Sequence, residues 1–372
     1  FTYDANGNLI QHTDRAGETW TYAYNGRGQL TRTVNPAGGA ITHTYHTTGT
    51  LASTTDSDIG VTRYAYDPAL RLREVTYPLT AFSTSANLHT TEIIYDQNGR
   101  ITALTDGRNQ TYTYTYDANG NVTAVIDPLG YQETYTYDLM DRRVTRTDRG
   151  GNVTAYAYDA LGHLSSVTDP NGNTVQFAYG AEGRLTQITD AADGVWQNGY
   201  SAEGALTHRT TPLGFTEQRD YTALGDLSAR SDPLGNTLTL TRDAHRRLAT
   251  FTDPLGRQTA YSYNALGQLI GVTQPVIGST TYDYNTLGTL TRVTDLNGQP
   301  WTFAYTTMGR LTQATDPLNH VWDYTLDARG FIDQITYPDG TIETRTYDAN
   351  GNLTRRQYSD GLDLHFTYDA IG

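Results

Sequence analysis

The sequence predicts an all-β protein, an antiparallel meander with two strands in every 21-residue repeat that winds into a hollow spiral or barrel-like shell. Three observations support this fold class. A segment that begins with tyrosine recurs at a 21-residue interval along the 372 residues. Each repeat contains two turn sequences, and the stretches between them have the Thr, Val, Ile and aromatic composition of β-strands. The resulting strands are too numerous for one sheet around a filled core.

The repeat begins at Tyr3 and registers 18 times, and 16 of these positions are Tyr. Every interval but one has the same length; the exception is the longer interval from Tyr66 to Tyr95, where an insertion lies near 78–88. We therefore treat residues 1–372 as a single array of about 18 repeats. Because the array starts and stops in the middle of a repeat, we expect it to be a fragment of a larger chain.

Each repeat contains two segments with turn chemistry. Asp or Asn follows the tyrosine in 13 of 18 repeats, and Gly lies four residues after it in 15 of 18, as in Asp4 and Gly7. A second segment starts eleven residues after the tyrosine and reads Asp-Pro-x-Gly, as in 169–172. Asp accepts hydrogen bonds from nearby amides, Pro fixes φ, and Gly permits positive φ. Both segments therefore predict tight turns.

The stretches between the turns predict strands such as Leu164–Thr168 and Thr174–Tyr179. Alternation places positions 17, 19 and 21 after each tyrosine on one face of the second strand. Position 19 is aromatic in 11 of 17 repeats, and position 17 holds all four tryptophans, which are Trp20, Trp196, Trp301 and Trp322. One face is thus predicted to carry an aromatic stripe, and Thr, Gln, Ala and Ser occupy the other.

The first strand of each repeat has a less regular pattern. Its leucine and the apolar residue three positions later, such as Leu164 and Val167, have opposite parity. This spacing predicts a β-bulge, or else a strand that is contacted on both faces.

The predicted number of strands determines the overall shape. Roughly 36 strands at about 4.8 Å each give a contour of about 170 Å, so a single winding would have a radius of about 27 Å. Side chains cannot fill that width, which favours a hollow shell. A β-propeller would need about 42 residues per blade, and no alternation between odd and even repeats supports it. Leucine-rich repeats need a Leu and Asn pattern that is absent.

Composition excludes several classes of function. The net charge of −14 argues against a sequence-independent nucleic-acid binder. No apolar run is long enough to span a membrane as a helix. The absence of Cys excludes disulfides and thiolate metal sites.

The motif Y-D-x-x-G-x-L at a 21-residue period, with D-P-x-G between copies, resembles the YD repeat of the Rhs family. That family includes toxin-complex B and C components, wall-associated toxins and teneurins. The resemblance covers essentially the whole chain. It implies a β-shell that encloses a toxin or effector polypeptide of a secreted polymorphic toxin, with flanking capping domains. It also implies export from a bacterial cell, to the extracellular space or the cell surface.

No catalytic, cofactor-binding or metal-binding residue is assigned. Family shells end in an aspartyl self-cleavage motif that resembles D-P-x-G-L, but the three DPLG segments, at Asp127, Asp232 and Asp253, lack the final Leu and lie at the ordinary turn phase. We interpret these aspartates as turn caps. The nine histidines fall at scattered phases, and no G-x-S-x-G motif occurs.

Two of the repeats that depart from the pattern introduce arginine. The repeat at Tyr137 has Asp141 and Arg143 in place of Gly and Leu, and the repeat at Arg242 has Arg246 in place of Gly. Together with Arg142, Arg146 and Arg247, these residues predict basic spots on an acidic protein. Drift within a redundant array is favoured over a contact with an enclosed chain or a partner domain.

Two functions remain in view. The leading hypothesis is a non-enzymatic scaffold that encloses a toxin or effector. The alternative is an extracellular adhesion or carbohydrate-binding module, in which the aromatic stripe binds a glycan. Unpaired edge strands at both ends also predict self-association.

Overall fold

The computed structural model describes residues 1–78 and 90–369, which form one sheet of 35 strands. Each strand pairs antiparallel with the next one along the chain, as β16–β17 and β17–β18 do. The described residues form no helix, so they contain no helix that is long and apolar enough to cross a membrane. The predicted all-β meander is confirmed. Of the predicted insertion near 78–88, only Pro78 belongs to the described residues.

The first half of the sheet consists of β1 (Thr2–Tyr3), β2 (Leu9–Thr13), β3 (Thr19–Tyr24), β4 (Leu30–Val34), β5 (Ala40–Tyr45), β6 (Leu51–Asp56), β7 (Gly60–Tyr66), β8 (Leu72–Thr76), β9 (Thr90–Tyr95), β10 (Ile101–Thr105), β11 (Thr111–Tyr116), β12 (Val122–Ile126), β13 (Gln132–Tyr137), β14 (Arg143–Thr147), β15 (Val153–Tyr158), β16 (Leu164–Thr168), β17 (Thr174–Tyr179) and β18 (Leu185–Thr189).

The second half consists of β19 (Val195–Tyr200), β20 (Leu206–Thr210), β21 (Thr216–Tyr221), β22 (Leu227–Ser231), β23 (Thr237–Arg242), β24 (Leu248–Thr252), β25 (Gln258–Tyr263), β26 (Leu269–Gln274), β27 (Gly278–Tyr284), β28 (Leu290–Thr294), β29 (Pro300–Tyr305), β30 (Leu311–Thr315), β31 (Val321–Leu326), β32 (Ile332–Thr336), β33 (Ile342–Tyr347), β34 (Leu353–Tyr358) and β35 (Asp363–His365).

The predicted β-bulge recurs where each odd-numbered strand pairs with the next even-numbered one. In the β17–β18 pair, Tyr179 lies opposite Leu185 but Ala178 lies opposite Gln187, which leaves Thr186 as the extra residue. The bulge changes the parity of the strand, so Leu185 and Ile188 share the face of Phe177 and Tyr179. The opposite parity seen in the sequence is thereby explained.

The repeated tyrosine fastens each hairpin to the one before it. The Tyr179 hydroxyl donates a hydrogen bond to the Leu164 carbonyl at 2.9 Å, 15 residues earlier. The same bond recurs at Tyr24, Tyr116, Tyr263 and Tyr347, among others. Phe would fill the same space but could not donate this bond, which explains why Tyr occupies 16 of the 18 positions.

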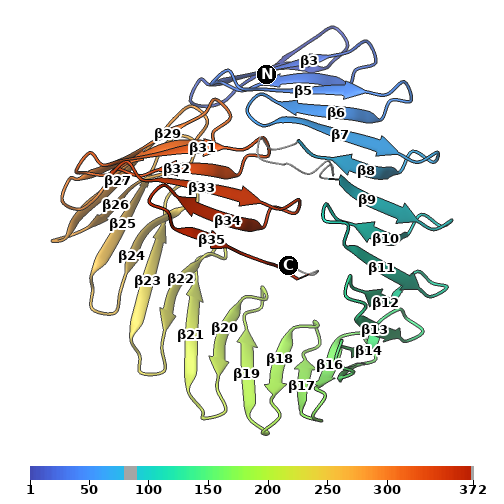
Figure 1. The fold of residues 1–372 in the computed structure, drawn as a ribbon. Helices are drawn as coiled ribbons and strands as arrows, with labels where there is room; N and C mark the ends of the chain where they lie inside the picture. The colour runs from blue at the N-terminus through green and yellow to red at the C-terminus, as the bar shows by residue number, and fades with distance from the viewer. Residues whose placement is uncertain (79–89, 370–372) are drawn as a thin grey trace.

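The sheet winds around an open centre and overlaps itself (Figure 1). Asn35, between β4 and β5, donates a hydrogen bond to Thr307, between β29 and β30, although the two are 272 residues apart. One winding therefore contains the 25 strands from β5 to β29, which gives a circumference of about 120 Å and a radius of about 19 Å. The radius of about 27 Å applies to a sheet that winds only once, and this sheet winds more than once.

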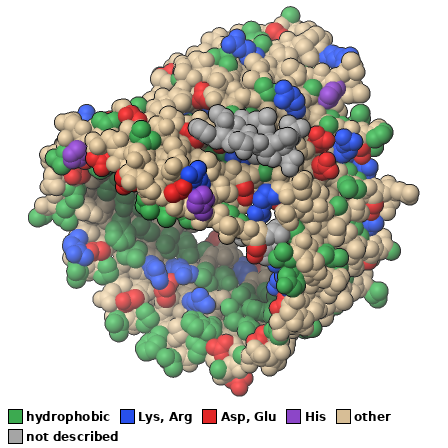
Figure 2. Space-filling view, viewed as in Figure 1, with side chains coloured by type: hydrophobic (Ala, Val, Ile, Leu, Met, Phe, Trp, Pro, Cys, Tyr) green, Lys and Arg blue, Asp and Glu red, His purple; other side chains and the backbone are tan. Residues whose placement is uncertain are grey.

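The wall is one sheet thick. The described residues expose 21731 Å² to solvent, whereas a compact protein of 41.1 kDa would expose about 14700 Å². The buried apolar residues in the described part of the chain are Val75, Ala124, Ala314 and Ile335 alone. Figure 2 shows a hollow whose wall carries hydrophobic side chains, while the outer surface is mainly polar side chains and backbone. The aromatic face is therefore the concave one, and the predicted hollow shape is confirmed.

Candidate functional site

The two kinds of turn lie on opposite rims of the wall. We call the turns that follow the repeat tyrosine, such as 159–162, YD turns, and the turns of the Asp-Pro phase, such as 169–172, DP turns. YD turns join each odd-numbered strand to the next even-numbered one, and DP turns join even-numbered to odd-numbered strands. Because strands alternate in direction, all YD turns lie on one rim and all DP turns on the other.

Where the windings overlap, DP turns of the first winding contact YD turns of the second, and we call this contact the seam. Arg310 of the second winding binds two carboxylates of the first, with Nη2 at 2.8 Å from Asp56 and Nη1 at 3.0 Å from Asp58. Farther along, Asn350 donates a hydrogen bond of 2.5 Å to Asp106. These bonds join the two windings rim to rim, and no described strand of one winding pairs with a strand of the other across the seam.

Arg108 extends the seam toward the last strand. Its Nη1 lies 3.6 Å from an Asp348 carboxylate oxygen and donates a hydrogen bond of 3.1 Å to the Asp369 carbonyl. Close backbone packing accompanies these polar contacts, because a Cβ atom on Gly107 would lie 3.0 Å from the Ala349 side chain. The two rims therefore fit together by shape as well as by charge.

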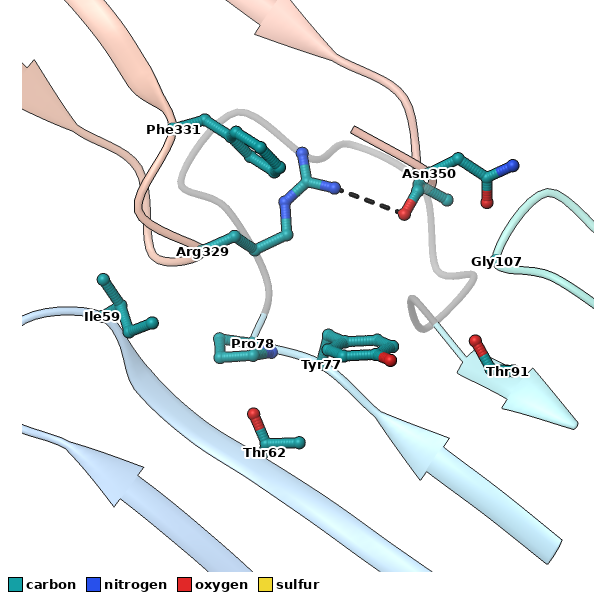
Figure 3. Close-up of a pocket in the computed structure, with 10 residues that line it drawn as sticks. Ile59, Thr62, Tyr77, Pro78, Thr91, Gly107, Arg329, Phe331 and Asn350 are labelled. Atoms are coloured by element: carbon teal, nitrogen blue, oxygen red, sulfur yellow. Dashed lines mark hydrogen bonds between the residues drawn. The ribbon is translucent and has the colours of Figure 1, made fainter. Parts of the chain in front are cut away.

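A pocket of about 390 Å³ lies between the two windings at the seam (Figure 3). Ile59, Tyr77 and Pro78 line it from the first winding, and Arg329 and Phe331 line it from the second. The Arg329 side chain is only 8% exposed. Its guanidinium stacks on the Phe331 ring at 5.0 Å, and its Nη1 donates a hydrogen bond of 2.8 Å to the Asp348 carbonyl. Arg329 thus holds a neighbouring YD turn in position for the seam.

The concave face carries the aromatic stripe that the sequence predicts. Trp301 and Trp322 stack with their ring centres 5.7 Å apart. On the YD rim, arginines lie over the tyrosine of the next repeat, for example Arg100 over Tyr116 at 4.7 Å. Each such contact adds a cation–π attraction to the hydrogen bond that the tyrosine makes. The aromatic rings therefore serve to join neighbouring hairpins.

Three ion-pair clusters interrupt this aromatic lining, and sequence reasoning missed them. Each joins a Glu to an Arg 13 residues later on the adjacent strand: Glu133 with Arg146, Glu217 with Arg230, and Glu343 with Arg356. The signal was present in the sequence, because in these repeats charged residues occupy two phases that hold mostly apolar or aromatic residues in the other repeats. Register then places each pair side by side on the concave face.

Glu343 is the most deeply buried of the three glutamates, with a side chain that is 0% exposed. It accepts hydrogen bonds from Tyr337 at 2.6 Å, Arg345 at 2.6 Å and Arg356 at 2.8 Å. Burial alone would raise the pKa of Glu343, but these hydrogen bonds outweigh burial and hold it well below its ordinary range. The Glu343 hydrogen bond and then burial raise the pKa of Tyr337 to about 12.

The cluster around Glu133 follows the same logic in a more exposed setting. Hydrogen bonds from Arg146 and Tyr135 lower the pKa of Glu133 to about 2. Burial, followed by the bond to Glu133, raises the pKa of Tyr135 to about 12. Both clusters therefore keep the carboxylate charged and the phenol neutral at physiological pH.

The three DPLG aspartates occupy DP turns, as predicted. Asp127 accepts the amide protons of Leu129 and Tyr131, both at 2.9 Å, and Asp232 and Asp253 accept equivalent pairs. Arg149 lies 3.0 Å from the second Asp127 oxygen. Turn capping accounts for their placement.

The residues predicted to form basic spots do not gather in one place. Arg142, Arg246 and Arg247 lie at the YD rim, where they bind Asp138, Asp226 and Asp243. Arg143, Arg146 and Arg242 belong to concave-face positions instead. Consecutive residues at a rim and a strand end point to different surfaces, so these arginines are divided between the YD rim and the concave face.

The substitutions at the glycine positions are compensated locally. Asp141 and Arg246 adopt φ of 59° and 64°, which is unusual for residues other than glycine. Asp141 accepts hydrogen bonds from Asn119 and Asn121 at 2.8 and 2.7 Å, and Arg246 binds Asp226. Each substitution therefore gains a bond to the preceding repeat.

No group of three or more His, Cys, Asp or Glu side chains in residues 1–78 and 90–369 is arranged to hold a metal ion. The histidines lie apart; His163, for example, binds Asp159 at 2.9 Å and stacks on Tyr179. The arrangement as a whole therefore offers a structural wall with a seam and a charged, aromatic inner face.

Comparison with known proteins agrees with this architecture. Residues 3–40, 95–132, 116–154 and 158–195 match the RHS Repeat family, and residues 236–372 match the Teneurin YD-shell family. No curated protein matches the chain significantly.

Solved toxin structures share the fold. The crystal structure of TcdB2-TccC3-TEV superposes with a TM-score of 0.83 over 99% of this chain at 15% identity. The Photorhabdus luminescens Tc holotoxin pore gives the same values, and TcdB2-TccC3-Cdc42 gives 0.82 over 98% at 15% identity. In each case the match spans 24% of the larger chain, so this chain is about a quarter as long as the proteins it resembles. Because the RHS Repeat and Teneurin YD-shell families together match most of the chain, the chain belongs to the Rhs/YD-repeat family.

Proposed function

We propose that this chain is a wall segment of a non-enzymatic shell that encloses a toxin or effector polypeptide. The observation that carries the proposal is the seam, where a single-layer sheet meets its own opposite rim after 23 to 25 strands. A sheet that overlaps itself in this way separates an inside from an outside. The mechanism is confinement, because the hydrogen-bonded wall keeps proteases and other macromolecules from the enclosed chain.

The test is reagent access from the two sides of the wall. Because the chain has no Cys, single cysteines can be placed at Val272 on the concave face and at its neighbour Thr273 on the outer face. A small maleimide should modify both variants at similar rates. A maleimide that carries a long polyethylene glycol chain should modify T273C much faster than V272C. Equal rates with the large reagent would show that the wall does not separate two compartments.

Partners of the parent protein form part of the proposal. The cargo would be a polypeptide within the hollow, and capping domains would cover the open ends. Likeness to toxin holotoxin structures and to the teneurin shell supports a location outside the producing cell, either secreted or at the cell surface. Immunodetection of the parent protein in culture medium and on intact cells tests this location, and signal confined to lysates would contradict it.

Self-association is the third element of the proposal. β1 and β35 each have one paired side. Leu213, Leu234 and Leu255 also project from consecutive DP turns with exposures of 82%, 85% and 77%, on the rim that forms the seam elsewhere. Light scattering of the purified chain should therefore show oligomers that dissociate in the L213S/L234S/L255S variant. A stable monomer would contradict this part of the proposal.

The alternative function, adhesion or glycan binding, is supported by the Teneurin YD-shell match over 236–372 and by the exposed Trp301. A glycan array distinguishes the two functions. Saturable binding that is lost in W301A would favour the alternative, and its absence would favour the container.

A further inference from the structure

Charged side chains are distributed unequally between the two faces of the sheet. In the described strands, concave-face positions hold eight arginines and four acids, a balance of +4: Arg143, Arg146, Arg209, Arg219, Arg230, Arg242, Arg345 and Arg356, with Asp56, Glu133, Glu217 and Glu343. Outer-face and bulge positions hold five arginines and seven acids, a balance of −2: Arg32, Arg63, Arg73, Arg292 and Arg355, with Glu74, Glu92, Asp220, Asp283, Asp323, Asp333 and Asp363. A protein of net charge −14 thus has a basic inner face.

Half of these inner arginines lie on four consecutive strands, β20 to β23. We call Arg209, Arg219, Arg230 and Arg242 the luminal arginine patch. Glu217 is the one acid at a concave-face position of these four strands, which leaves a local balance of +3. The blue side chains on the wall of the hollow in Figure 2 are arginines, because the chain contains no Lys.

The register brings like charges together within the patch. Arg219 and Arg230 lie directly opposite each other on β21 and β22, an arrangement that destabilises a sheet unless a counter-charge is present. Glu217 supplies that charge, at 2.7 Å from Arg219 and 2.6 Å from Arg230. One carboxylate therefore serves two guanidinium groups.

The other two arginines have no carboxylate within ion-pair distance among the described residues. Arg209 lies over the Trp196 ring at 4.7 Å, and Arg242 donates a long hydrogen bond of 3.5 Å to the Arg246 carbonyl. Both are exposed on the concave side. Their guanidinium groups keep free N–H donors in the geometry that binds carboxylates in pairs.

We propose that the luminal arginine patch binds a carboxylate-rich segment of the polypeptide that the shell encloses. This inference rests on the proposed container function and names the chemistry of the contact. A concave wall concentrates the field of its charges toward the hollow, so the patch would attract an acidic segment and repel a basic one. The neighbouring Trp196 gives the segment an apolar surface beside the charges.

The experiment measures binding of a fluorescein-labelled poly-glutamate peptide to the purified chain by fluorescence anisotropy. Poly-glutamate should bind, and its affinity should fall as salt is raised, because salt screens the exposed arginines. A poly-glutamine peptide of equal length should not bind. The R209Q/R242Q variant, which leaves the Glu217 ion pairs intact, should weaken binding by about fivefold.

Matched controls make the result specific to the inner face. The R63Q/R292Q variant removes the same charge from exposed outer-face positions and should leave the affinity unchanged. The E217Q variant adds net positive charge to the patch and should tighten binding. Circular dichroism verifies that each variant is folded before its binding is measured.

The inference is overturned if poly-glutamate does not bind, or if the inner and outer variants weaken binding equally. Either result leaves the container function standing, because reagent access to V272C and T273C tests that function independently. If the reagent test fails while the R209Q/R242Q variant still loses affinity, the patch is an anion-binding surface on an open sheet, and its assignment to an enclosed segment is overturned.

Discussion

Arg310 binds Asp56 across the seam, with Nη2 2.8 Å from Oδ2, although 254 residues separate them in the sequence. Both side chains are largely buried, at 25% and 14% exposed. The pair joins the start of the second winding to the first, so it reports whether the wall overlaps itself.

Removing this pair should destabilise the seam. We expect R310Q to lower the free energy of unfolding by about 1–3 kcal/mol, because it leaves the partly buried Asp56 and Asp58 without their charged donor. Thermal unfolding followed by circular dichroism measures the loss. R257Q is the matched control, since Arg257 is 75% exposed beside its partner Asp253, and it should unfold at the temperature of the unmodified chain. Equal effects of the two variants would contradict the seam.

The Glu343 cluster should be the most sensitive ion-pair site of the wall. E343Q leaves Arg345 and Arg356 without their shared carboxylate, and we expect a loss of about 3–5 kcal/mol, as for a broken buried ion pair. E133Q is the control, because Glu133 is 20% exposed and binds one arginine bidentately. E133Q should lower the free energy of unfolding by less than E343Q does. Urea denaturation at pH 7 provides both values, and a larger loss for E133Q would refute the ranking.

Acid should unfold the wall between about pH 4.5 and pH 2. Hydrogen bonds from Arg146 and Tyr135 lower the folded-state pKa of Glu133 to about 2 from an ordinary 4.5. Burial raises the pKa of Asp56, but the hydrogen bond from Arg310 outweighs burial, so the folded-state pKa of Asp56 is also lowered. A lowered folded-state pKa stabilises the protein above the unfolded value and loses that contribution as pH falls through the folded value. Stability measured by urea midpoints should therefore be flat from pH 7 to 5 and fall below that; a rise on acidification would contradict it.

Glycine at the YD turn is most constrained where a neighbouring ring is close. Gly351 has φ of +90°, and a Cβ atom there would lie 2.7 Å from the Phe331 ring. We expect G351A to cost about 2–4 kcal/mol, from both backbone strain and the clash. Gly130 has φ of +85° with open space around it, so G130A should cost only about 1 kcal/mol. Similar losses in the two variants would show that backbone strain alone decides the cost.

Much of the fold could be predicted because local chemistry repeats in phase. The tyrosine period predicts the strands, and the Asp and Gly positions predict both turns. The parity of Leu164 and Val167 predicts the bulge. The hollow shape followed from strand number and the spacing of strands. These features depend on neighbours in the same or the adjoining repeat, so a short stretch of sequence is enough to reveal them.

The seam and the ion-pair clusters could not be predicted as readily. The radius of the winding depends on the twist accumulated over some 25 strands, and no single repeat records it. Without the radius, nothing in the sequence pairs Arg310 with Asp56. The Glu343 and Arg356 pair was within reach, because both occupy phases that hold mostly apolar or aromatic residues in the other repeats, but their proximity required the register of the bulged strand.

The distance between spin labels tests the overlap of the wall most directly. Because the chain has no Cys, labels can be attached to cysteines at the exposed turn residues Ala37, Thr307 and Asn171. Pulsed electron paramagnetic resonance should give less than about 25 Å for the pair at 37 and 307, and about 38 Å for the pair at 37 and 171, which lie on opposite sides of the winding. In an open sheet, 25 strands would separate 37 from 307 by about 120 Å. A 37–307 distance beyond about 60 Å, half of that open-sheet separation, would contradict the wound, hollow wall.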